Sequence, residues 1–308
     1  MYINFFMGIT APFLKLIIKE NNHKPLEGKL MVIGKQTIGV SKDELRKIFE
    51  SHNLSFDNLS KIKNFDNQTL HGKRYKSKKF FHDHDVFKNI SPNLRYNSLD
   101  RSKYEGAKIV QDMNFPLNKK LNNKFDVIID GGCMDNLFNP INFITNVSKM
   151  LKPGGRFMCA NHFFQAPGAF LTFNPEWYYG FFAVNNYKDV KVYVALAKKN
   201  SKNKSRYNYK SELYEYKPYF KRNKNYDYFD AVKNMNTIAN VLVVAEKAKN
   251  STNDKYPCQL QYMDNKEINW AKKYFDYKKS KRKLFNIRNN YNKKIFNSDH
   301  YNLLDNNY

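Results

Sequence analysis

The chain has 308 residues, enough for one large domain or for a domain with an appendage. Its 53 Lys and Arg residues against 28 Asp and Glu give a formal net charge of +25. This charge excludes an acidic protein and suggests an anionic partner such as nucleic acid. Asn, Lys and Tyr crowd the whole chain, however, so a general bias in composition explains the charge better than a phosphate-binding surface does.

The cysteines and the apolar segments bear on the cellular location. Cys133, Cys159 and Cys258 have no metal-binding spacing and cannot form a disulfide framework, which predicts a reducing, cytoplasmic location. No apolar run approaches about 20 residues, so no transmembrane helix is predicted. The apolar residues 1–18 lack a basic start and an Ala-x-Ala-like cleavage site. We interpret them as a helix that packs on the domain, with a signal peptide as the alternative.

Short apolar runs alternate with helical patterns along the chain. Ser41 and Glu44 match a capping box that opens a helix, and a second helix is predicted over residues 83–90. Residues 52–80 are polar and basic, and we expect loop and short helix there. The predicted strands cover residues 30–33, 94–99, 107–110, 127–129, 156–160, 190–196 and 241–245.

This alternation predicts an α/β fold, a doubly wound, mostly parallel, seven-stranded Rossmann-like sheet with helices on both faces. The predicted domain spans residues 1–248, with an insertion at about 41–80. Residues 249–308 would form a basic, Asn/Lys/Tyr-rich C-terminal extension. Trp270, Tyr274 and Phe275 fit one amphipathic helix in this extension, lying on the domain or in a loosely ordered tail.

The segment FDVIIDGGCMDNLFNPINFITNVSKMLKPGGRF, residues 125–157, is the most informative part of the chain. A buried strand leads directly into Asp130-Gly131-Gly132, and ligands of open parallel sheets bind beyond the carboxyl ends of strands. Apolar residues at helical spacing follow, and Pro153-Gly154-Gly155 is predicted to end that helix and turn the chain back.

Acidic residues follow three successive predicted strands, namely Asp100, Asp112 and Asp130, and Gly34 follows the first strand. A carboxylate can accept hydrogen bonds from the two hydroxyls of a ribose or from the amine of adenine. A glycine lets backbone approach a ligand closely. The order of these residues favours a nucleoside site, with structural turns as the alternative for each.

The 125–157 segment and the order of strands resemble the class I S-adenosylmethionine-dependent methyltransferases. LRYNSLDRSKYEGAKIVQDMNFPL resembles the second and third strands of one bacterial branch, and VLVVAEK resembles the closing strand of the family. The resemblance implies that Asp100 holds the ribose and that Asp112 and Met113 contact adenine. It implies S-adenosylmethionine as the cofactor.

The chain departs from the family at two places. The glycine-rich first loop is replaced by Gly34-Lys35-Gln36, which resembles a Gly-basic-Gln variant in the same branch. A Glu-His pair that often follows the fourth strand is replaced by Asp135-Asn136, and Asn136 cannot take a proton.

Candidates for chemistry follow the fifth predicted strand. They are Asn161, His162 and Gln165, of which only His162 titrates near neutral pH, and a buried structural histidine is the alternative. The aromatic run from 163 to 184 could line an acceptor pocket or pack on the sheet. The run from His82 to Asp85 is predicted to cap a helix through an aspartate, since adjacent residues do not converge on a metal.

Three functional hypotheses follow. The first is an S-adenosylmethionine-dependent methyltransferase that acts on a small molecule, a sugar or another metabolite, with no metal and no membrane span. The second is an RNA methyltransferase that uses the basic insertion and tail. The third is a non-catalytic binding protein on a degenerate methyltransferase fold.

Overall fold

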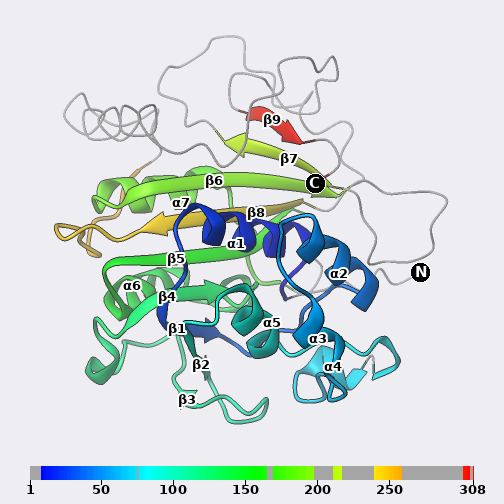
Figure 1. Cartoon of the computed structure of the whole chain (residues 1–308). Helices are drawn as coiled ribbons and strands as arrows, with labels where there is room; N and C mark the ends of the chain where they lie inside the picture. The colour runs from blue at the N-terminus through cyan, green and yellow to red at the C-terminus, as the bar shows by residue number, and fades with distance from the viewer. Residues whose placement is uncertain are drawn as a thin grey trace.

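The computed structural model describes residues 8–74, 76–164, 169–197, 211–216, 239–258, 301–305 and 308. Within these ranges nine strands form one sheet, in the order β3-β2-β1-β4-β5-β8-β6-β7-β9 (Figure 1). The strands are β1 Gly28–Ile33, β2 Leu94–Asp100, β3 Ile109–Val110, β4 Phe125–Asp130, β5 Leu151–Phe164, β6 Lys188–Ala197, β7 Ser211–Tyr216, β8 Ala239–Glu246 and β9 Tyr301–Asp305.

The sheet has a parallel half and an antiparallel half. Strands β3, β2, β1, β4 and β5 pair in parallel, whereas every pairing from β5 to β9 is antiparallel. The seven strands predicted from the sequence are all present, but a seven-stranded, mostly parallel sheet is wrong. Strands β7 and β9 extend it, and the polar sequences SELYEY and YNLLD lack the apolar run by which a buried strand is recognised.

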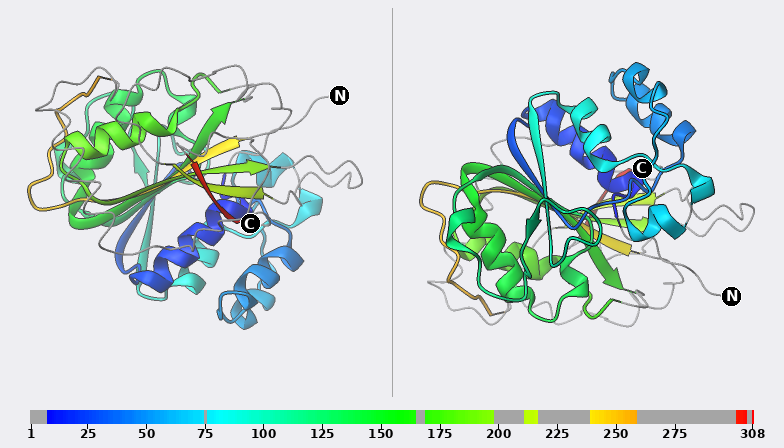
Figure 2. Two further views of the ribbon diagram at one scale, coloured as in Figure 1. Left: turned by 90° about the horizontal axis from the view of Figure 1, so that it is seen from above. Right: turned by 90° about the horizontal axis from the view of Figure 1, so that it is seen from below.

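Helices cover both faces of the sheet (Figure 2). Residues of β1 alternate between the two faces, so Leu30 and Val32 join one core cluster and Met31 and Ile33 join the other. The first face carries α1 Ala11–His23, α2 Lys42–Glu50, α3 Asp57–Ser60, α4 Leu70–Arg74 and α5 Asp83–Ile90, and the second carries α6 Pro140–Met150 and α7 Pro175–Val184. Short 3-10 turns are η1 Lys76–Lys78, η2 Lys119–Leu121 and η3 Met134–Asn136.

The start of α2 confirms a sequence signal, because the Ser41 side chain accepts a hydrogen bond from the Glu44 amide. The predicted turn at Pro153-Gly154-Gly155 is wrong. Helix α6 ends at Met150, and the Pro-Gly-Gly residues form an irregularity inside β5, where the register with β4 shifts.

The N-terminal apolar segment forms a helix on the domain as predicted from Ala11 onward, with Phe13, Leu14 and Ile17 fully buried. The amphipathic helix expected around Trp270 and the candidate Gln165 lie outside the described residues. None of the helices within the described ranges is long and apolar enough to cross a membrane.

Helix α1 is fixed to the sheet by a buried ion-pair cluster. Glu20 is fully buried and lies 2.9 Å from both Arg156 on β5 and Lys191 on β6. Lys191 also pairs with Asp189 at 2.8 Å. Removing the shared carboxylate would leave two buried cations with less compensation, which is more costly than losing a surface pair.

We predict that Glu20→Gln lowers the free energy of unfolding by about 3–5 kcal/mol, because Arg156 and Lys191 stay buried while their shared countercharge is lost. Urea unfolding of the wild type and the variant measures this difference. Asp43→Asn is the control, since it breaks the exposed Arg46–Asp43 pair and should cost less than about 1 kcal/mol. Equal losses in the two variants would contradict this role for the cluster.

Candidate functional site

The strand order reverses direction between β1 and β4. Strand β1 is followed by elements that lead to β2 and β3 on one side, and β4 leads to β5 on the other. The register pairs Ile33 with Asp130, so the loops after β1 and β4 begin side by side at Gly34 and Gly131. Open α/β sheets bind ligands at such a switch point, beyond the carboxyl ends of the strands.

The two glycines face side chains of the chain itself. A Cβ at Gly34, where φ is +65°, would lie 2.4 Å from the Cys133 sulfur, and one at Gly131 would lie 2.5 Å from Gln36 Oε1. The Gln36 side chain is buried, and its Nε2 donates to the Ile33 carbonyl at 2.7 Å. Gln36 therefore fills the space between the two loops.

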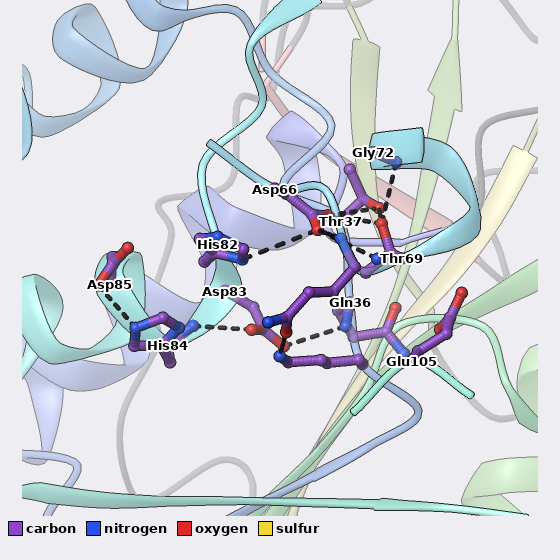
Figure 3. Close-up of polar contacts among 12 residues, drawn as sticks. Gln36, Thr37, Asp66, Thr69, Gly72, His82, Asp83, His84, Asp85 and Glu105 are labelled. Carbon is purple, nitrogen blue, oxygen red and sulfur yellow. Dashed lines mark hydrogen bonds and ion pairs between the residues drawn. The ribbon is translucent and has the colours of Figure 1, made fainter. Parts of the chain in front are cut away.

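Two buried carboxylates hold the first loop (Figure 3). Asp83 Oδ2 accepts from the Gln36 amide at 3.0 Å and from the Tyr96 hydroxyl at 2.8 Å. Asp66 accepts from the Thr37 hydroxyl at 3.3 Å and from the Thr69 amide at 3.1 Å. Helix α5 and the segment around Asp66 thus fix the loop from one side.

Asp83 is the first residue of α5 rather than its cap, because the N-cap is His82, which makes no side-chain capping bond. The predicted aspartate cap is therefore wrong. Full burial raises the pKa of Asp83 to about 6, although its hydrogen bonds to Gln36, Tyr96 and His84 act in the opposite direction. Among the described residues no group of three His, Cys, Asp or Glu side chains could hold a metal ion.

Residues 68–70 also reach the loop after β2. The Leu70 amide donates to Glu105 Oε1 at 2.5 Å, and the Lys35 ammonium contacts Gln68 Oε1. Gly106 has a φ of +75°, and a Cβ at this position would lie 3.5 Å from Gln68 Oε1. Residues 68–70 therefore border the strand ends at which Asp100 lies.

Asp100 ends β2 and is half-buried, and its carbonyl accepts from the Gln111 amide at 2.8 Å. No hydrogen bond within the described ranges engages its carboxylate. The Gly34 amide donates to the carbonyl of Leu99 at 2.7 Å, so Asp100 directly borders the first loop. Of the three aspartates predicted to follow strands, Asp100 is the one whose carboxylate is left without a hydrogen bond among the described residues and could therefore bind a ligand.

The other predicted residues have internal partners. Asp112 Oδ1 accepts from the Asn114 amide at 2.9 Å in a turn, and Met113 is buried in the core. Asp130 is fully buried and accepts from the Cys133 amide at 2.7 Å and from Asn161 Nδ2 at 3.1 Å. Burial raises the pKa of Asp130 to about 7.

His162 lies within β5, which continues beyond the predicted end at residue 160 to Phe164. Its Nδ1 is 2.5 Å from Asp135 Oδ2, and its amide donates to the same oxygen at 3.2 Å. Both side chains are buried. Sequence reasoning missed Asp135 as a partner of His162, although a carboxylate soon after β4 and a histidine near the end of the adjacent parallel strand were a usable signal.

Most of the predicted aromatic run packs in the core, including Tyr178, Tyr179 and Phe182. A cavity of about 270 Å³ nevertheless opens between α6, α7 and residues 256–258, with Trp177 and Tyr256 in its lining. The amide of Phe173 donates to the His162 carbonyl at 2.8 Å, and its ring packs on Trp177 at 5.0 Å. Phe173 therefore connects the lining of this cavity to the histidine strand.

No family model matches the sequence, and no curated protein matches it. In structure the chain is similar to S-adenosylmethionine-dependent methyltransferases. Haemonchus contortus phosphoethanolamine N-methyltransferase 2, solved in complex with S-adenosyl-L-methionine, is 11% identical, with a TM-score of 0.37 over 76% of this chain and 52% of that one. The chain thus spans about half the length of that protein.

Two further solved structures are similar to most of this chain. Burkholderia thailandensis 1,6-didemethyltoxoflavin-N1-methyltransferase is 9% identical, with a TM-score of 0.35 over 77% of each chain. A methyltransferase from Thermotoga maritima, described as a possible histamine N-methyltransferase, is 15% identical, with a TM-score of 0.34 over 77% of this chain and 90% of that one.

We predict that the stability difference between the wild type and Asp83→Asn depends on pH. The folded-state pKa of about 6 exceeds the ordinary value of 3.8, so the contribution of Asp83 is fully present below pH 3.8 and is lost as the pH rises through 6. The wild type should lose roughly 3 kcal/mol relative to the variant across this window.

Urea unfolding at pH 4, 5, 6 and 7 measures the change. The side-chain amide that the Asp83→Asn substitution introduces does not titrate, so any packing cost of the substitution is the same at every pH. A difference between the wild type and Asp83→Asn that is constant with pH would contradict the raised pKa.

Proposed function

We propose that this protein is an S-adenosylmethionine-dependent methyltransferase that acts on a small molecule, a sugar or another metabolite. The observation that carries the proposal is the switch point between β1 and β4, where the loops starting at Gly34 and Gly131 lie side by side next to the open carboxylate of Asp100. The sequence resemblance over residues 94–160 supports the same assignment.

The residues at this edge fit the nucleoside part of the cofactor. Asp100 would accept hydrogen bonds from the ribose hydroxyls, and Lys35 lies in the neighbouring loop after β1. Asp112 would reach adenine through Oδ2, the oxygen outside its turn, and Met113 would support the base from the core side. In this proposal Asp130 acts indirectly, because its hydrogen bond to the Cys133 amide shapes the loop after β4.

The methionine part of the cofactor would lie near Gly34 and Gly131, where Gln36 now fills the space. Binding there requires the Gln36 side chain to move. When bound, the cofactor supplies an activated methyl group. The protein contributes chiefly by aligning the acceptor with that group, since positioning alone supplies a large part of the rate of such displacements.

We predict that S-adenosylhomocysteine binds the purified protein and that Asp100→Ala weakens binding by about 10- to 100-fold, because the ribose loses an ionised acceptor. Isothermal titration calorimetry measures both affinities. Asp43→Ala, on the exposed side of α2, is the matched control and should bind like the wild type. Absence of heat from S-adenosylmethionine and S-adenosylhomocysteine at millimolar concentration would remove the proposal.

A second candidate is a non-catalytic binding protein on the same fold, and the position of Gln36 favours it. Its side chain donates from Nε2 to Ile33 and lies within 3.4 Å of the Cys133 sulfur. Such a filled space would exclude the cofactor. We expect Gln36→Ala to bind S-adenosylhomocysteine more tightly than the wild type if the side chain competes with it. A wild type that binds nothing beside a variant that binds would favour the second candidate.

A further inference from the structure

The cavity between α6 and α7 lies on the second face of the sheet, apart from the switch point. Its volume is about 270 Å³, and its lining comes from α6, from α7 with its N-cap Asn174, and from residues 256–258. The lining includes none of the residues proposed to bind the cofactor. Small-molecule sites have volumes of roughly 300–1,000 Å³, so this cavity is close to the lower end of their range.

The segment after β8 forms one wall of the cavity and is tied to both helices. Asn185, the fully buried C-cap of α7, accepts the Lys255 amide at 3.2 Å and the Thr252 hydroxyl at 2.7 Å through Oδ1. Its Nδ2 donates to the Lys255 carbonyl at 2.9 Å. On α6, the Thr145 hydroxyl donates to the Asn253 carbonyl at 3.4 Å. These bonds fix the chain directly before the lining residues 256–258.

Gly180 lets this wall approach α7 closely. A Cβ on Gly180 would lie 3.1 Å from Pro257 Cγ, which is tighter than an ordinary contact. Pro257 can therefore lie close to α7 because position 180 is a glycine. A wall that is already in place does not have to be ordered when a ligand binds, which lowers the free-energy cost of binding.

Aromatic rings line the cavity on both sides of this contact. Trp177 on α7 is half-buried, and its ring centroid lies 5.0 Å from that of Phe173 and 5.1 Å from that of Tyr178. Tyr256 supplies a second ring and is 58% exposed. Offset-stacked and edge-to-face ring pairs gain attraction beyond the apolar area that they bury. The lining therefore favours an aromatic ligand over an aliphatic ligand of the same size.

Most of the remaining lining is apolar, and the cavity is open to solvent at its edge. Phe181 is buried, whereas Ile141 is 39% exposed and borders the opening. Polar lining residues lie at the start of α7, where Asn174 Oδ1 accepts the Glu176 amide at 3.0 Å. A charged ligand would lose hydration against the apolar walls, so a neutral ligand fits them better.

We propose that this cavity is a binding site for a neutral aromatic molecule of about two fused rings. An apolar cavity of roughly 150 Å³ holds one benzene ring, so a volume of about 270 Å³ accommodates a second fused ring. The ligand contacts Trp177 and Tyr256 and enters past Ile141. The site is separate from the nucleoside edge, so the proposal does not depend on the methyltransferase function.

Titration with 2-naphthol, a neutral molecule of two fused aromatic rings, tests the proposal. The full-length protein is labelled with 5-fluorotryptophan, and because the chain has two tryptophans the Trp177 resonance is assigned by its loss in Trp177→Phe. We expect a saturable ¹⁹F shift of Trp177 with a dissociation constant of about 1 mM or lower. Absence of a saturable shift up to about 5 mM 2-naphthol would overturn the proposal.

A pair of matched variants places the ligand in the cavity. Tyr256→Ala removes an exposed aromatic wall and should weaken binding of 2-naphthol by about three- to tenfold. Tyr104→Ala is the control, because Tyr104 is 67% exposed in the loop after β2 and does not line the cavity, and it should bind like the wild type. Thermal unfolding followed by circular dichroism compares the folds of the two variants. Equal affinities of the two variants would overturn the proposal.

The saturated analogue decahydro-2-naphthol tests the chemical class of the ligand. It has the carbon skeleton and the hydroxyl of 2-naphthol but no aromatic ring. We expect it to bind the wild type about three- to tenfold more weakly, because it cannot stack on Trp177 and Tyr256. An equal or higher affinity of decahydro-2-naphthol would contradict an aromatic ligand. Neither titration contains S-adenosylmethionine, so both outcomes are independent of the proposed function.

Discussion

The parallel pairing of β1 with β4 is the constraint on which the rest of the structure depends. Its register places Ile33 beside Asp130, so that two loops start together and diverge toward opposite sides of the sheet. The place where the two loops start is fixed by the backbone hydrogen bonds of this pairing and not by any one side chain. The sequence of each loop then decides what lies between the two loops, and here it is the Gln36 side chain of the first loop.

Buried carboxylates are frequent at the sheet edge where these two loops start. Asp66, before α4, and Asp83, in α5, hold the loop after β1, while Asp130 and Asp135 organise the loop after β4. Burial makes each of these acids costly unless donors surround it, which explains the number of backbone amides aimed at them. Residues 66–69 therefore have a structural role at this edge, because they supply hydrogen-bond partners to the loop after β1.

The sequence predicted well those features that depend only on residues close together in the chain. The apolar runs at 30–33 and 127–129 and the cap at Ser41 depend on neighbours in sequence, and the structure confirms them. Strands β7 and β9 were missed because their pairing is non-local and their residues are polar. The Pro-Gly-Gly irregularity in β5 was mistaken for a turn, since both use glycine at positive φ and only the neighbouring strand distinguishes them.

The sequence predicted candidate residues at the ends of strands, but it could not predict the direction of their side chains. Asp100 and Asp130 both end strands. The Asp100 carboxylate accepts no hydrogen bond within the described residues, whereas the Asp130 carboxylate accepts from the Cys133 amide and from Asn161. This difference depends on whether the side chain at the end of the strand points toward hydrogen-bond donors of the chain itself. The partnership of Asp135 with His162 likewise joins residues 27 positions apart through the pairing of β4 with β5.

A crystal structure of the protein with S-adenosylhomocysteine tests the account most directly. We predict that the ribose hydroxyls lie within hydrogen-bond distance of the Asp100 carboxylate, beside the loops that follow β1 and β4, and that the Gln36 side chain has left the space between Gly34 and Gly131. S-adenosylhomocysteine bound elsewhere on the chain, or crystals grown at saturating concentration in which Gln36 still fills that space and no ligand borders Asp100, would contradict it.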